Sequence, residues 1–126
     1  MKNKLYFYFG GLGGPFYKIL YKNKQFEINL GNFSSNKTFY LSCPLKDKWD
    51  EFWLFLDKNK VWGWNKKYIN QNVIDGTQWE IEFSNYKKKV KSYGSNKFPS
   101  KKLFKKLVSQ IEILFNFKLN CLKDEI

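Results

Sequence analysis

The feature that most constrains this chain is the strict alternation of apolar and polar residues in several short segments. The clearest case is residues 79–83, in which Trp79, Ile81 and Phe83 alternate with two glutamates. Residues 25–30 show the same pattern. Because successive side chains of a β-strand point to opposite faces, these segments predict strands with one buried face and one solvated face. Such a sheet needs another layer to cover its apolar face.

Helices are the second layer that the sequence predicts. Two segments carry apolar residues at the 3.6-residue spacing of an amphipathic helix. The first runs from about residue 44 to residue 58 and begins at a proline, which is favoured in a first helical turn. The second runs from residue 99 or 100 to residue 117. The expected core stripes are Leu45, Trp49, Phe52 and Leu56 in the first helix, and Leu103, Leu107, Ile111 and Leu114 in the second.

Turn residues separate the remaining segments, and no linker divides the 126 residues. The chain therefore predicts a single α+β domain over residues 1–126. Its expected order is ββββ-α-ββ-α, an antiparallel sheet of about six strands with two helices packed on one face. The strands are expected at residues 5–9, 16–21, 25–30, 38–43, 79–83 and 88–92, with a loop at residues 93–96.

The residue content excludes several kinds of chemistry. The chain has no histidine, which rules out histidine-containing metal sites and catalytic triads. Its two cysteines, Cys43 and Cys121, lie too far apart in sequence for the usual zinc-site spacing. In a reducing cytoplasm we expect both to be free and buried. We therefore expect no catalytic residue, no metal and no cofactor.

Two patterns that resemble reactive sites have simpler structural interpretations. Glu80 and Glu82 share one face of a strand, and we expect them to pair with Lys89 and Lys91 on the next strand rather than to act as an acid–base pair. The glycine run at residues 10–14 leads into a strand-like segment and not a helix, so a hairpin loop is favoured over a phosphate-binding loop.

Charge is the strongest functional feature, because 23 basic and 11 acidic residues give a net charge of +12. This charge favours an acidic protein, a nucleic acid or an anionic surface as a partner. The basic residues are all lysines, and alanine is absent while asparagine and isoleucine are abundant. That composition is expected of an AT-rich genome, so codon bias is an alternative origin of the charge. The missing arginine argues against bidentate phosphate or base recognition.

The lysines gather at two places, the second hairpin and the start of the last helix. Cations in a first helical turn oppose the helix dipole, so structural needs alone do not explain lysine there. Two tyrosines beside the hairpin lysines are candidate stacking platforms for single-stranded nucleic acid. A solvated lysine-rich surface is the simpler alternative. The candidate partner-binding residues are Tyr86, Lys87, Lys88, Lys89, Lys91, Tyr93, Lys101, Lys102, Lys105 and Lys106.

Three short motifs follow one another in the second half of the chain. They are Trp62-Gly63-Trp64, Asp75-Gly76-Thr77-Gln78-Trp79, and Gly94-Ser95-Asn96-Lys97-Phe98-Pro99. In these motifs, over roughly residues 49–115, the chain resembles small uncharacterised bacterial proteins with W-x-W, D-G-T-x-W and G-S-N-x-[FY]-P segments. The resemblance implies a fold unit and no established activity.

If the last two motif loops meet at one end of the sheet, they form a candidate small-ligand site. The residues of that site would be Trp62, Trp64, Asp75, Gly76, Thr77, Trp79, Gly94, Asn96 and Pro99.

The sequence thus predicts a non-catalytic binding domain that engages an acidic protein partner, as an immunity-type or host–phage conflict protein would. Two alternatives are a non-specific nucleic-acid-binding protein and a ligand-binding or enzymatic domain at the motif loops. No apolar run approaches the ~20 residues of a membrane span. The charged start at residues 1–4 is not followed by the apolar core of a signal peptide, so we expect a cytoplasmic protein.

Overall fold

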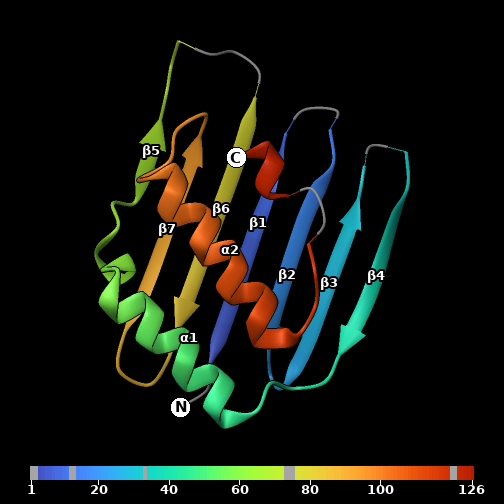
Figure 1. Cartoon of the computed structure of the whole chain (residues 1–126). Helices are drawn as coiled ribbons and strands as arrows, with labels where there is room; N and C mark the ends of the chain where they lie inside the picture. The colour runs from blue at the N-terminus through green and yellow to red at the C-terminus, as the bar shows by residue number, and fades with distance from the viewer. Residues whose placement is uncertain (1–2, 12–13, 33, 73–75, 120–121) are drawn as a thin grey trace.

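A computed structural model describes residues 3–11, 14–32, 34–72, 76–119 and 122–126. It shows an α+β fold in which one seven-stranded sheet has the strand order β4-β3-β2-β1-β6-β7-β5 (Figure 1). The strands are β1 (Lys4–Gly11), β2 (Phe16–Lys22), β3 (Gln25–Gly31), β4 (Asn36–Leu41), β5 (Lys67–Ile69), β6 (Thr77–Ser84) and β7 (Lys89–Ser95). The helices are α1 (Lys46–Lys58) and α2 (Lys101–Phe115), with short 3₁₀ turns η1 (Val61–Gly63) and η2 (Lys123–Glu125).

Strand β1 lies at the centre of the sheet and pairs antiparallel with both β2 and β6. The first four strands form a meander that ends at β4, which is one edge of the sheet. After α1 the chain returns on the other side of β1 and builds β6 and β7 there. Strand β5 closes the opposite edge and pairs parallel with β7.

Both helices cover the same face of the sheet (Figure 1). The buried residues of the strands alternate with more exposed ones, as in β6, where Trp79, Ile81 and Phe83 are buried and the two glutamates are not. The buried face of α2 includes Phe104, whose ring lies 5.1 Å from that of Trp79. In the described chain no helix is long and apolar enough to cross a membrane.

The coarse prediction of an α+β fold in the order ββββ-α-ββ-α agrees with the structure, but the expected six antiparallel strands are one too few. The missed strand β5 has only three residues, which is too short to show alternation. Strand β7 also extends through residues 93–95, which were predicted to be a loop. Gly94 hid this strand because it contributes no side chain to the pattern.

Three predicted side-chain positions are also corrected. Leu45 was placed in the core stripe of the first helix but precedes α1 and is 71% exposed. Cys43 is exposed rather than buried, because it lies after β4 ends at Leu41, in the linker to α1 and not in the strand. Cys121 lies outside the described residues. Glu82 faces Lys91 in the register, but its ion pair is with Lys4 on the other neighbouring strand, at 2.8 Å.

Candidate functional site

The first half of α2 presents the most concentrated free positive charge of the described chain. Lys101, Lys102, Lys105 and Lys106 are all exposed, on the side of the helix that faces away from its buried stripe. Ser100 caps the helix by accepting a hydrogen bond from the Leu103 backbone N–H at 3.1 Å. This cap fixes where α2 begins, and it therefore places the first two lysines in the first turn.

Nothing in the described chain neutralises these four lysines. The ion pairs of the described residues involve Lys4, Lys46, Lys88 and Lys123, and none involves the α2 cluster. The first turn of α2 contains no acidic residue, although the helix dipole favours one there. The arrangement therefore opposes the dipole without any compensating contact inside the protein, and an external anionic group would remove that penalty.

The exposed ridge of α2 continues into an apolar residue that sequence reasoning did not single out. Lys102, Lys106 and Ile113 are spaced by four and seven residues, so they lie along one line of the helix. Ile113 is 43% exposed. The sequence did indicate this ridge, because Ile113 lies at helical spacing from Lys102 and Lys106. The ridge therefore places one exposed aliphatic side chain in line with two exposed lysines.

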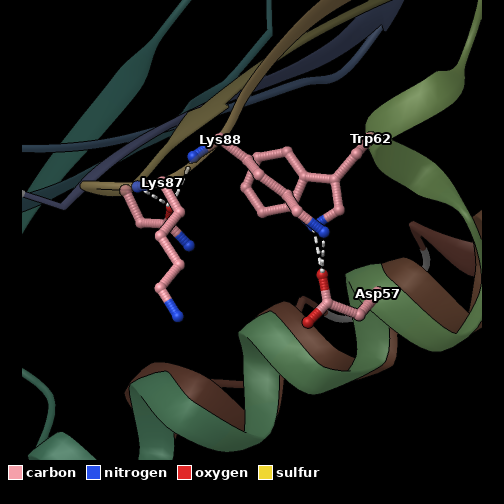
Figure 2. A network of polar contacts seen from close by, with 5 residues as sticks. Asp57, Trp62, Lys87 and Lys88 are labelled. Atoms are coloured by element: carbon pink, nitrogen blue, oxygen red, sulfur yellow. Dashed lines mark hydrogen bonds and ion pairs between the residues drawn. The ribbon is translucent and has the colours of Figure 1, made fainter.

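The hairpin lysines are placed differently, because two of them have contacts within the protein. Lys88 donates to the carboxylate of Asp57 at 3.1 Å, and the indole N–H of Trp62 donates to the same oxygen at 2.8 Å. Figure 2 shows this shared carboxylate, with Lys87 extending away from it. The Lys87 ammonium instead lies 5.3 Å from the centre of the Tyr86 ring. Part of the hairpin cluster thus links β7 to the end of α1.

Lys89 and Lys91 alternate with the buried Val90 and therefore lie on the open face of the sheet, away from the helices. The α2 lysines lie in the helix layer on the other face. The two clusters also lie toward opposite ends of β7, because this strand begins at the hairpin and its end leads into α2. Its seven residues span about 20 Å. The structure therefore separates the two predicted lysine clusters.

The two candidate stacking tyrosines are also apart. Tyr86 is 66% exposed in the hairpin turn, whereas Tyr93 is half-buried on the open face opposite Glu80. The four-residue step along β7 from Lys89 to Tyr93 alone covers about 13 Å. The two rings do not form one platform for adjacent bases.

The open face of the sheet carries an electrostatic feature that the sequence did not suggest. Tyr6 lies there beside Glu82 in the register. Burial, followed by the charge of Glu80 and by Tyr8, raises the pKa of the Tyr6 phenol above its ordinary value. The centre of this face therefore holds two glutamates among its tyrosines, and Lys4 pairs with one of them, Glu82.

The second and third motif loops meet at one end of the sheet. The backbone N–H of Asn96 donates to the carbonyl of Thr77 at 2.8 Å. Gly76 has a positive φ of 152°, and a Cβ at this position would overlap the Asn96 side chain. Pro99 is half-buried just before the cap of α2. Asp75 lies outside the described residues.

The aromatic residues of these motifs are packed inside the protein. Trp79 is 1% exposed, and its indole N–H donates to the carbonyl of Lys97 at 2.8 Å. Its ring covers Gly94 so closely that a Cβ there would overlap it. Trp64 packs edge-on against Trp79 at 6.1 Å. Trp62 stacks on Trp53 at 5.7 Å. Trp64 and Trp79 thus anchor the corner where the loops meet, and Trp79 has no surface for stacking on a ligand. The structure does not bring Trp62 to that corner, because its indole binds Asp57, which also pairs with Lys88 of the hairpin at the other end of β6 and β7.

A shallow hollow of about 300 Å³ remains beside the meeting loops. Glycines and Pro15 form most of its wall, and among the described residues Glu125 is its acidic member. Within the described part of the chain, no cluster of three or more acidic or cysteine residues could hold a metal ion. The described residues therefore place few convergent polar groups, of the kind that orient a small molecule, in this hollow.

No known family accounts for this arrangement. A scan of protein-family models finds no match to the chain, and a search of curated proteins finds no similar sequence. The α2 lysine cluster with Ile113 is the candidate binding surface of the described chain.

Proposed function

We propose that this protein is a non-catalytic binding domain whose α2 surface engages an acidic protein partner. The observation that carries this proposal is the exposed α2 cluster, formed by Lys101, Lys102, Lys105 and Lys106, which has no ion-pair partner among the described residues. An acidic surface placed against this cluster would form ion pairs with the lysines. It would also interact favourably with the positive end of the helix dipole.

Ile113 supports a protein partner over a nucleic acid. It extends the lysine ridge with an exposed aliphatic side chain, which can be buried against an apolar residue of another protein. Nucleic-acid surfaces usually combine lysine and arginine with accessible aromatic rings. Here arginine is absent, and the exposed Tyr86 lies at the other end of the sheet from the start of α2.

A small basic domain of this kind could serve as an immunity-type or host–phage conflict protein, whose role is to occupy a partner's surface rather than to catalyse a reaction. This is the part of the proposal that depends on the identity of the partner.

The proposal is tested by affinity capture from a lysate of the source cells, treated with nuclease and held at about 150 mM salt, where weak non-specific binding to nucleic acid is largely lost. Wild-type protein is compared with the double variant Lys102→Glu/Lys106→Glu. The matched control is Lys87→Glu/Lys89→Glu, which makes the same change in net charge at the hairpin.

We expect the wild type and the hairpin variant to retain a protein of acidic composition that the α2 variant loses. The proposal is wrong if both double variants retain the same proteins. Capture that disappears only on nuclease treatment would instead favour the nucleic-acid alternative. Anisotropy titrations with single- and double-stranded oligonucleotides at increasing salt would then measure that binding directly.

A further inference from the structure

Strand β4 is an edge strand that leaves backbone hydrogen-bonding groups without a partner in the described chain. It pairs with β3 on one side only and ends the strand order. In Figure 1 it lies beyond the area that the helices cover. Five of its six residues are exposed and the sixth, Leu41, is half-buried. Edge strands of this length are usually protected by charges, prolines or bulges. The segment here has one lysine, and the ladder with β3 is regular along its whole length.

Two hollows lie along the helix side of β4, one toward each end of the strand, and together they are called the groove below. A hollow of about 700 Å³ lies between the linker after β4 and the end of α2, with Leu41, Leu45, Ile113 and Phe117 in its wall. A second hollow of about 330 Å³ lies at the other end of β4. Phe39, which is 38% exposed, lines the second hollow, and its ring contacts that of Phe117 at 5.7 Å. Apolar residues therefore occupy the middle of the groove.

Positive charge marks both ends of this groove. Lys37 lines the hollow at the start of β4. Lys48 and Lys118 line the hollow at its other end. None of the three has an ion-pair partner among the described residues. Among the described residues of the wall the acidic one is Glu112, which already accepts a hydrogen bond from the Leu119 N–H and pairs with Lys123.

The groove is continuous with the proposed partner surface, because Ile113 belongs to both. A second copy of the chain is a poor occupant, since each copy carries a net charge of +12 and pairing of two β4 edges would bring these charges together. An acidic occupant fits the same lysines without that repulsion.

We propose that β4 receives an extended segment of the acidic partner, which adds to the sheet as an eighth strand. Side chains on the helix side of such a strand would meet Lys37, Phe39 and Leu41 in turn and then Lys48 and Lys118. On the helix side, the recognised segment therefore carries acidic residues at both ends and apolar residues in the middle. The alternate residues, which face the other side of the sheet, can be of any polar type. Main-chain hydrogen bonds to the edge supply affinity, and the groove selects the sequence. This inference rests on the proposed acidic partner and names where part of it docks.

The probe is a synthetic peptide of the sequence Glu-Thr-Val-Thr-Leu-Thr-Glu, which reads almost the same in both directions and therefore suits either strand orientation. Binding to the full chain is followed by amide shifts in NMR spectra of 15N-labelled protein. A peptide with lysine at both ends tests charge. Two N-methylated peptides, one methylated at the odd positions and the other at the even positions, test strand addition. In an added strand only one of these two sets of N–H groups faces β4.

We expect the acidic peptide to shift amides of β4 and of the groove wall, and the lysine-ended peptide to bind at least about tenfold more weakly. One N-methylated peptide should lose about tenfold in affinity and the other should not. Phe39→Ser should weaken binding severalfold, whereas Tyr40→Ser, on the same strand but the opposite face, should leave it unchanged. Mass spectrometry should also show slower alkylation of Cys43, which lines the groove.

The inference is overturned if the peptide shifts no β4 amide, if the two N-methylated peptides bind alike, or if sedimentation velocity shows that β4 pairs with a second copy. Shifts confined to α2 would overturn the groove while leaving the acidic partner in place. The partner itself fails separately, when both double variants of the capture experiment retain the same proteins.

Discussion

The indole of Trp79 covers Gly94 and reaches past it to the carbonyl of Lys97, to which it donates a hydrogen bond of 2.8 Å. The glycine is buried, and a Cβ on it would overlap the indole and lie 2.6 Å from that carbonyl oxygen. The D-G-T-x-W motif and the G-S-N-x-[FY]-P motif therefore pack against each other through Trp79 and Gly94.

Gly94→Ala should therefore destabilise the protein by about 2–3 kcal/mol, because the added methyl group has no room in a packed interior. The measurement is the free energy of unfolding in urea. Gly63→Ala is the matched control, since a Cβ there meets nothing within 4 Å, and its effect should stay within about 0.5 kcal/mol. Equal effects of the two substitutions would contradict the packing argument.

Tyr6 should titrate above the ordinary tyrosine pKa, owing first to burial and then to the charge of Glu80. The raised pKa means that the fold favours the neutral phenol. This contribution to stability is complete below pH 10, the ordinary pKa of tyrosine, and is lost as the pH rises through the folded-state pKa. Glu80→Gln should lower the Tyr6 pKa without restoring it fully, because burial remains.

The Tyr6 titration is measured from the ring carbon shift of the labelled tyrosine against pH. Glu51→Gln is the control, because Glu51 is an exposed residue of α1 and makes no contribution to the Tyr6 shift. A Tyr6 pKa that is the same with and without the Glu80 charge would show that Glu80 does not contribute to the raised pKa.

Lys102→Glu should increase the stability of the isolated protein by about 0.5–1 kcal/mol, because it places a negative charge in the first turn of α2 and four residues before Lys106. Lys58→Glu makes the same change in charge in the last turn of α1 and should destabilise by about 0.5 kcal/mol. Chemical denaturation measures both. If Lys102→Glu proves destabilising, the lysine has a structural purpose and its assignment to partner binding loses its basis.

Glu112 holds the segment after α2 against the helix. It is 8% exposed, accepts from the Leu119 N–H at 2.7 Å and pairs with Lys123 at 3.2 Å. Glu112→Ala should cost about 2–3 kcal/mol, because it leaves a buried N–H without an acceptor. Glu112→Gln, which keeps an acceptor oxygen, should cost less. Lys123→Ala should cost under about 1 kcal/mol, since Lys123 is partly solvated. Thermal and urea unfolding distinguish these three levels.

The alternation of apolar and polar residues was enough to determine the fold class of this protein and most of its strands. Strand alternation has a period of two and helix amphipathicity a period of 3.6, so local patterns separate them. Ser100, the apolar stripe of α2 and the exposed lysines opposite that stripe all follow from the same local rules.

Only the tertiary structure decided which lysines remain free, because ion pairs such as Lys88–Asp57 join residues 31 positions apart. It also decided that the two lysine clusters lie apart, that the Trp79 indole binds the carbonyl of Lys97, and that β4 is an edge strand. Each of these depends on strand order and register, which arise when a whole apolar face is buried at once. Local periodicity does not predict which strands become neighbours, so these features can be seen only in the folded structure.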